Sequence, residues 1–118
     1  MSKAVEYHKQ GYNCAESLIK AVNDVNAKNI PVALGSPFGS GMGVGATCGA
    51  ITGAMIAIGA MLGREEAAQP NKARACGQIF MEKVKETYGT YECHELKKRG
   101  VSCDEIIAFT EGLLTEKV

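Results

Sequence analysis

The sequence predicts an all-α fold, a small bundle of about five helices around a central helix rich in glycine and alanine. Apolar residues recur at helical spacing in several segments, and residue types typical of helix caps precede those segments. The intervening residues are rich in the glycine, asparagine and proline of turns. With 118 residues and one continuous pattern, we expect a single domain that spans residues 1–118.

The first two helices are predicted near the amino terminus. Residues 2–10 form a short helix that Gly11 ends. The second helix is predicted to begin after Asn13, whose side chain can cap it, with Glu16 completing a capping box. Cys14 is then its first helical residue, and the apolar spacing places this thiol on the buried face.

The central helix is predicted within residues 41–63, GMGVGATCGAITGAMIAIGAMLG, an uncharged stretch that opens as a glycine-rich turn. Three of its glycines recur every four residues, namely Gly45, Gly49 and Gly53. On a helix they would form one smooth stripe, which another backbone or a flat group can approach closely. The stripe therefore predicts either close helix packing or a surface that binds a cofactor.

The remaining helices follow the charged residues after the central stretch. One is predicted from near residue 70 to residue 87, ending at Gly89, with Cys76 in its middle as a small apolar residue. A short element is predicted at residues 91–98. The last helix begins with SCDE, an S-x-x-E capping box that makes Cys103 its first helical residue.

Four of the five cysteines are thus predicted in the first turn of a helix: Cys14, Cys48, Cys93 and Cys103. For Cys48 the expected cap is Thr47. The free N–H groups and the positive end of the dipole at a helix start stabilise a thiolate. We therefore expect these helix starts to converge on a thiolate-rich pocket at one end of the bundle, closed on one side by the glycine stripe.

Several chemistries remain open for such a pocket. The chain has no C-x-x-C pair, which argues against a thioredoxin-like motif, a local zinc knuckle or attachment of a c-type haem. Four dispersed thiolates suit an iron-sulfur cluster or a tetrahedral zinc ion. Alternatively, pairs of thiols cycle between dithiol and disulfide, with Cys14 and Cys48 as the expected pair. His94 could be a metal ligand or a base that lowers the pKa of a thiol, but we expect it to be a solvent-exposed side chain without either role. We expect the same of His8.

Composition excludes some classes of function. Thirteen Lys and Arg balance thirteen Asp and Glu without a basic run, so no electrostatic footprint for nucleic acid is predicted. Residues 29–63 carry no charge, but their Gly, Ala, Ser and Thr insert weakly into a bilayer and two prolines interrupt them, which argues against a membrane span. The charged start MSKAVEYHKQ lacks the apolar core of a secretory signal and predicts the cytoplasm.

Several motifs together resemble the C_GCAxxG_C_C family, which is described as redox-active. They are NCA at 13–15, GMG at 41–43, TCGAITGA at 47–54, CHEL at 93–96 and the final Cys103. The resemblance spans almost the whole chain and implies that the four cysteines at helix starts are the shared ones, with Cys76 extra. It also implies an all-helical domain similar to one in split-Soret cytochromes, where an iron-sulfur site has been suspected.

We therefore expect a redox-active protein whose four cysteines bind an iron-sulfur cluster, ahead of zinc, because four dispersed thiolates match a coordination site. One alternative is a metal-free protein of thiol–disulfide exchange. Another is a non-catalytic interaction domain that dimerises through its Gly/Ala-rich helix. The sequence does not identify the electron donor or acceptor, nor whether the protein is an enzyme.

Overall fold

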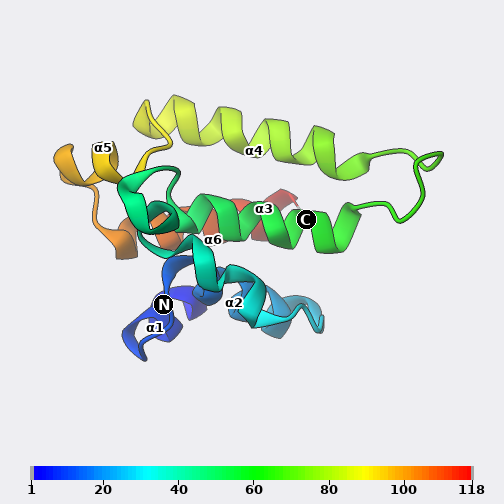
Figure 1. The fold of residues 1–118 in the computed structure, drawn as a ribbon, viewed down its shortest axis with the longest axis horizontal. Coiled ribbons are helices and arrows are strands. Elements are labelled where there is room, and N and C mark those ends of the chain that lie inside the picture. The colour runs from blue at the N-terminus through cyan, green and yellow to red at the C-terminus, as the bar shows by residue number, and fades with distance from the viewer. Residues whose placement is uncertain (1, 118) are drawn as a thin grey trace.

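A computed structural model describes residues 2–117, which form helices joined by turns (Figure 1). Its α-helices are α1 (Lys3–Lys9), α2 (Cys14–Asn26), α3 (Gly49–Leu62), α4 (Lys72–Tyr88), α5 (Cys93–Lys98) and α6 (Cys103–Lys117). A 3-10 helix, η1 (Val32–Phe38), and a single wide turn, η2 (Gly41–Gly45), connect α2 to α3. The predicted all-α fold is confirmed, with six α-helices in the described part of the chain where about five were expected.

The Gly/Ala-rich helix α3 lies at the centre, as predicted. Figure 1 shows it between α4 on one side and α2 on the other, with α6 behind it, and it packs on all three. Small side chains let several helices approach one axis closely. Phe80 of α4, Leu18 of α2 and Ile107 of α6 are among the side chains that fill the space around it and are at most 1% exposed.

Two glycines of the predicted stripe set the distance between α2 and α3. A Cβ atom added to Gly53 would lie 2.7 Å from the Cα atom of Ala15, and one added to Gly49 would lie 3.2 Å from the Cβ atom of Cys14. The stripe prediction is wrong for Gly45, which precedes the helix with φ of +75°. The face that carries the other two is covered by α2 of the same chain, so close packing explains them.

Most helix ends follow from the capping residues. The predicted capping box of α2 is present, because Asn13 Oδ1 accepts from the N–H of Glu16 at 2.8 Å and Glu16 Oε1 accepts from the N–H of Asn13 at 2.9 Å. Helix α4 begins two residues after Pro70, since Asn71 provides the cap. It ends at Gly89 as predicted, where φ is +76°. None of the helices in residues 2–117 is both long and apolar enough to span a bilayer.

Candidate functional site

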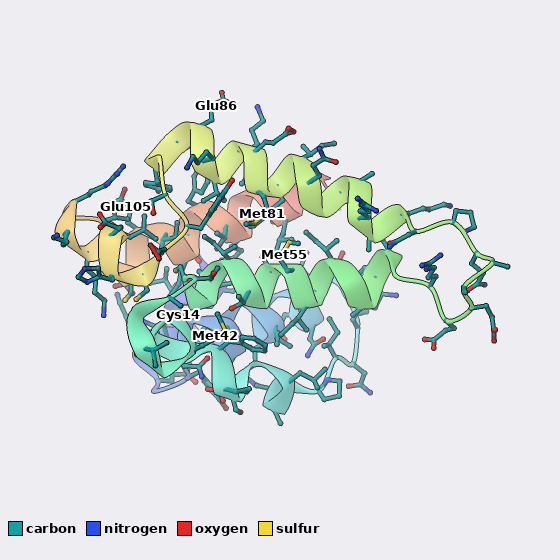
Figure 2. The ribbon with its side chains drawn as sticks, turned by 45° about the horizontal axis from the view of Figure 1, so that its top comes forward. Cys14, Met42, Met55, Met81, Glu86 and Glu105 are labelled. Atoms are coloured by element: carbon teal, nitrogen blue, oxygen red, sulfur yellow. The ribbon has the colours of Figure 1, made fainter. Side chains whose placement is uncertain are left out.

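The helix starts that carry cysteines lie at one end of the molecule (Figure 1), and the labelled Cys14 marks this end in Figure 2. Three of the thiols line one cavity of about 10 Å³, and the fourth, that of Cys14, is close enough to interact electrostatically with each of them. We call this group the four-cysteine site: Cys14, Cys48, Cys93 and Cys103. Cys76 is not part of it and packs, half-buried, against the core from α4.

A short backbone bridge places two of the four cysteines. Thr47 and Glu92 form an isolated antiparallel bridge. The N–H of Cys48 donates to the carbonyl before Glu92 at 2.8 Å, and the N–H of Cys93 donates to the carbonyl before Thr47 at 2.7 Å. Since side chains alternate along such a pair, Cys48 and Cys93 lie on the same side of it. Sequence reasoning missed this bridge, which has no local signature.

The bridge also corrects the predicted start of α3. Thr47 was expected to cap the helix, with Cys48 as the first helical residue. In the structure Thr47 is held in the bridge, so Cys48 itself occupies the cap position and the helix begins at Gly49. The Cys48 side chain makes no capping hydrogen bond of standard geometry, although the N–H groups of Ala50 and Ile51 favour its thiolate.

Cys14 and Cys103 are brought together by contacts between the first and last helices. His8 Nδ1, near the end of α1, lies 3.2 Å from Asp104 Oδ1 at the start of α6. The turn after α1 leads directly to Cys14, which is 8% exposed. At the start of α6 the predicted cap is present, since Ser102 Oγ accepts from the N–H of residue 105 at 3.1 Å, and Cys103 is the first helical residue. His8 is thus half-buried and partnered, whereas His94 is exposed as expected.

The glycine-rich turn packs against Cys93 of the four-cysteine site. Most of its residues have positive φ: Ser40, Gly41, Met42, Gly43 and Gly45. A Cβ atom on Gly41 would lie 2.6 Å from the backbone nitrogen of Ala46 and 2.9 Å from the Cβ atom of Cys93. Only glycine combines this conformation with such a close approach. The alternating glycines of GMGVG are the sequence signal for the turn. The role of Gly45, Gly49 and Gly53 in binding a cofactor stays a prediction.

Burial raises the pKa of two thiols of the site, whereas their positions at helix starts were expected to lower it. It raises the pKa of Cys14 to about 12, and the negative charges of Cys103, Cys48 and Cys93, with a hydrogen-bonding contact to the Cys103 thiol, add to the rise. Burial also raises the pKa of Cys48, and the N–H groups behind it offset this only in part. Loss of hydration therefore outweighs the helix ends at these two thiols.

Stability should consequently fall as the pH rises above about 9. In the unfolded chain the Cys14 thiol loses its proton near its ordinary pKa, about 8.5, whereas in the folded protein it keeps the proton to about pH 12. Deprotonation therefore favours unfolding in this window, by up to about 1.4 kcal/mol per pH unit for one thiol. Urea unfolding at pH 8 and pH 10 measures the slope. The variant Cys14→Ala should show a shallower decline, and an identical decline in both proteins would contradict the assignment.

As they stand, the thiols are packed against one another. Within residues 2–117 no three His, Cys, Asp or Glu side chains are arranged to hold a metal ion. The cavity between the thiols has room for about one water molecule. The donor chemistry of four thiolates nevertheless matches the ligand set of an iron-sulfur cluster or a zinc ion. Small movements of the sulfurs would be needed to admit either.

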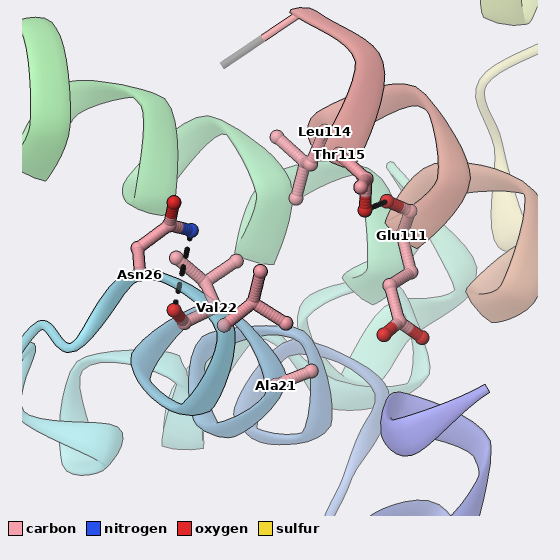
Figure 3. Close-up of a pocket in the computed structure, with 7 residues that line it drawn as sticks. Ala21, Val22, Asn26, Glu111, Leu114 and Thr115 are labelled. Atoms are coloured by element: carbon pink, nitrogen blue, oxygen red, sulfur yellow. Dashed lines mark hydrogen bonds between the residues drawn. The ribbon is translucent and has the colours of Figure 1, made fainter.

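A larger cavity of about 90 Å³ lies between α2 and α6 (Figure 3). Its lining is mainly apolar, from residues such as Val22 and Leu114. The one carboxylate, that of Glu111, already accepts hydrogen bonds from Ser2 Oγ and from the N–H of Ala4. This larger cavity contains no cysteine and is separate from the four-cysteine site.

Comparison with known proteins gives one match. The family model described as "Putative redox-active protein (C_GCAxxG_C_C)" matches residues 12–117. The matched range holds all four cysteines of the site and every element from α2 to α6, and it leaves out α1. No curated protein and no solved structure matches the chain.

Proposed function

The chain belongs to the C_GCAxxG_C_C family, and on this premise we propose that the four-cysteine site is its redox centre. One observation carries the proposal: helix starts scattered through the sequence place three thiols around one small cavity and the fourth, that of Cys14, beside them. Thiols are the protein groups that most readily undergo reversible two-electron oxidation. The fifth cysteine, Cys76, lies outside the site and takes no part.

The packing of the site supports thiol–disulfide exchange. The thiol of Cys14 lies within hydrogen-bonding reach of that of Cys103, and it interacts electrostatically with Cys48 and Cys93. Two thiols this close need little rearrangement to form a disulfide. Oxidation of one pair of thiols to a disulfide releases two electrons and two protons. The reduced site could therefore donate two electrons if one pair forms a disulfide, or four if two pairs do.

The donor set supports a second form of the centre. Cys14, Cys48, Cys93 and Cys103 would hold an iron-sulfur cluster, with zinc as the weaker candidate, because four thiolates are the usual ligands of such clusters. When bound, a cluster supplies one-electron transfer. In this form the chain's own residues exclude water from the ligands, since three of the four cysteines are at most 8% exposed. The partner in either form is an electron donor or acceptor.

Anaerobic purification, followed by metal and acid-labile sulfide analysis and a visible spectrum, tests the proposal. Iron and sulfide in matched amounts with charge-transfer bands would support the cluster form. A colourless, metal-free protein whose thiols oxidise and re-reduce in glutathione buffers would support thiol–disulfide exchange. A colourless protein whose buried thiols stay reduced throughout would contradict a redox function and favour a structural role for the cysteines.

A further inference from the structure

The four thiols of the site differ in how far solvent reaches them. Cys14, Cys48 and Cys93 are 8%, 4% and 8% exposed, whereas Cys103 is only partly buried. The cavity beside Cys103 is too small for any reagent larger than water. An incoming molecule therefore has to react at the surface, where Cys103 is the least buried residue of the four.

Position also favours Cys103 as the reacting thiol. It is the first residue of α6, at the edge of the site, and it lines the cavity together with Cys48 and Cys93. Lys97, an exposed residue of α5, lines the same cavity and adds a positive charge nearby. Cys14, in contrast, is 8% exposed and lies behind Cys103 in the site. The two thiols are thus unequal in access to solvent.

Cys48 and Cys93 are close but poorly placed to form a disulfide with each other. In the bridge between Thr47 and Glu92 they occupy diagonal positions, whose Cα atoms in such pairs lie about 7–8 Å apart. A disulfide normally requires Cα atoms within about 7 Å. The backbone hydrogen bonds of 2.8 and 2.7 Å that fix the bridge oppose the movement needed to close the gap.

We propose that Cys103 exchanges with a disulfide of a partner molecule and that Cys14 resolves the product, leaving a Cys14–Cys103 disulfide. This inference rests on the proposed function in its metal-free form. The Cys103 thiolate attacks one sulfur of the partner disulfide, whose S–S bond breaks and releases one thiolate. The Cys14 thiol passes its proton to this first thiolate, and the resulting Cys14 thiolate attacks the Cys103 sulfur of the mixed disulfide. The second thiolate leaves and takes up from solvent the proton that Cys103 gave up on ionising. The partner is reduced to two thiols, and Cys14 and Cys103 are oxidised by two electrons.

The test uses the full-length protein, reduced and freed of metal with a chelator, and oxidised glutathione as the partner disulfide. After equilibration and alkylation, peptide mapping by mass spectrometry identifies each linkage. We expect a Cys14–Cys103 crosslink in the wild type and in Cys76→Ser. In Cys14→Ser we expect glutathione to remain attached at Cys103, because the resolving thiol is gone.

A crosslink between any other pair, or glutathione trapped on Cys48 or Cys93 instead, would overturn the inference while leaving the redox function standing. Absence of any oxidised thiol in the wild type would contradict both the inference and its metal-free premise. Circular dichroism of Cys14→Ser checks that the variant is folded. If it is not, Cys14→Ala provides the same readout, since either change removes only the resolving sulfur.

Discussion

Replacement of Gly53 by alanine is expected to lower the free energy of unfolding by about 1–3 kcal/mol, the usual cost of forcing an extra group into a packed core. The added Cβ atom would lie 2.7 Å from the Cα atom and 2.8 Å from the carbonyl oxygen of Ala15. Both atoms belong to the backbone of α2, so no side-chain rotation relieves the overlap. Helices α2 and α3 have to separate, and this outweighs the higher helix propensity of alanine.

The matched control lies one and a half turns further along the same helix. Gly59 has no neighbouring atom within 4 Å of an added Cβ, and it is exposed. Gly59→Ala should therefore gain up to about 1 kcal/mol from helix propensity alone. Urea unfolding of the two variants beside the wild type measures the contrast. Equal effects of both substitutions would show that the contact between α2 and α3 does not limit stability.

The same contact between α2 and α3 connects the fold to the four-cysteine site. Cys14 and Ala15 begin α2, and Cys48 and Gly49 begin α3. The small size of Gly49 allows its backbone to approach the side chain of Cys14, where an added Cβ would lie 3.2 Å from the Cys14 Cβ atom. The distance between these two helix starts is therefore set by glycine, and with it the spacing of the thiols that each start carries.

The parts of the structure that depend on local chemistry could be predicted from the sequence. The capping box at Asn13, the serine cap before Cys103 and the end of α4 at Gly89 each involve residues within one turn of one another. From these ends follows the placement of Cys14 and Cys103 as first helical residues. The gathering of the four cysteines was an expectation from this placement together with the family resemblance.

The parts that depend on distant contacts could not be predicted. The bridge between Thr47 and Glu92 joins residues far apart in the sequence, and neither belongs to an alternating strand pattern. The direction of the pKa shifts was missed for a related reason. A cap and a helix dipole can be read locally, but the loss of hydration at Cys14 and Cys48 depends on which helices cover them.

The largest functional effect is expected from Cys14→Ser, which should abolish cluster binding in one form of the centre and the intramolecular Cys14–Cys103 disulfide in the other. The variant removes one ligand from a four-thiolate cluster and one partner from the dithiol. Serine is nearly isosteric, so the loss of stability should be about 1 kcal/mol, the typical effect of a mild substitution. The measurements are iron and sulfide per chain and the yield of the intramolecular disulfide in glutathione buffer.

Two further variants make the result specific. Cys76→Ser should keep the full activity, because Cys76 lies on α4 outside the site. Cys48→Ser separates the two forms of the centre: it should abolish binding of a cluster but spare a Cys14–Cys103 disulfide, in which it takes no part. If Cys14→Ser kept the activity while Cys76→Ser lost it, the redox centre would have to be sought on α4, and the gathering of the other four thiols would be a feature of packing alone.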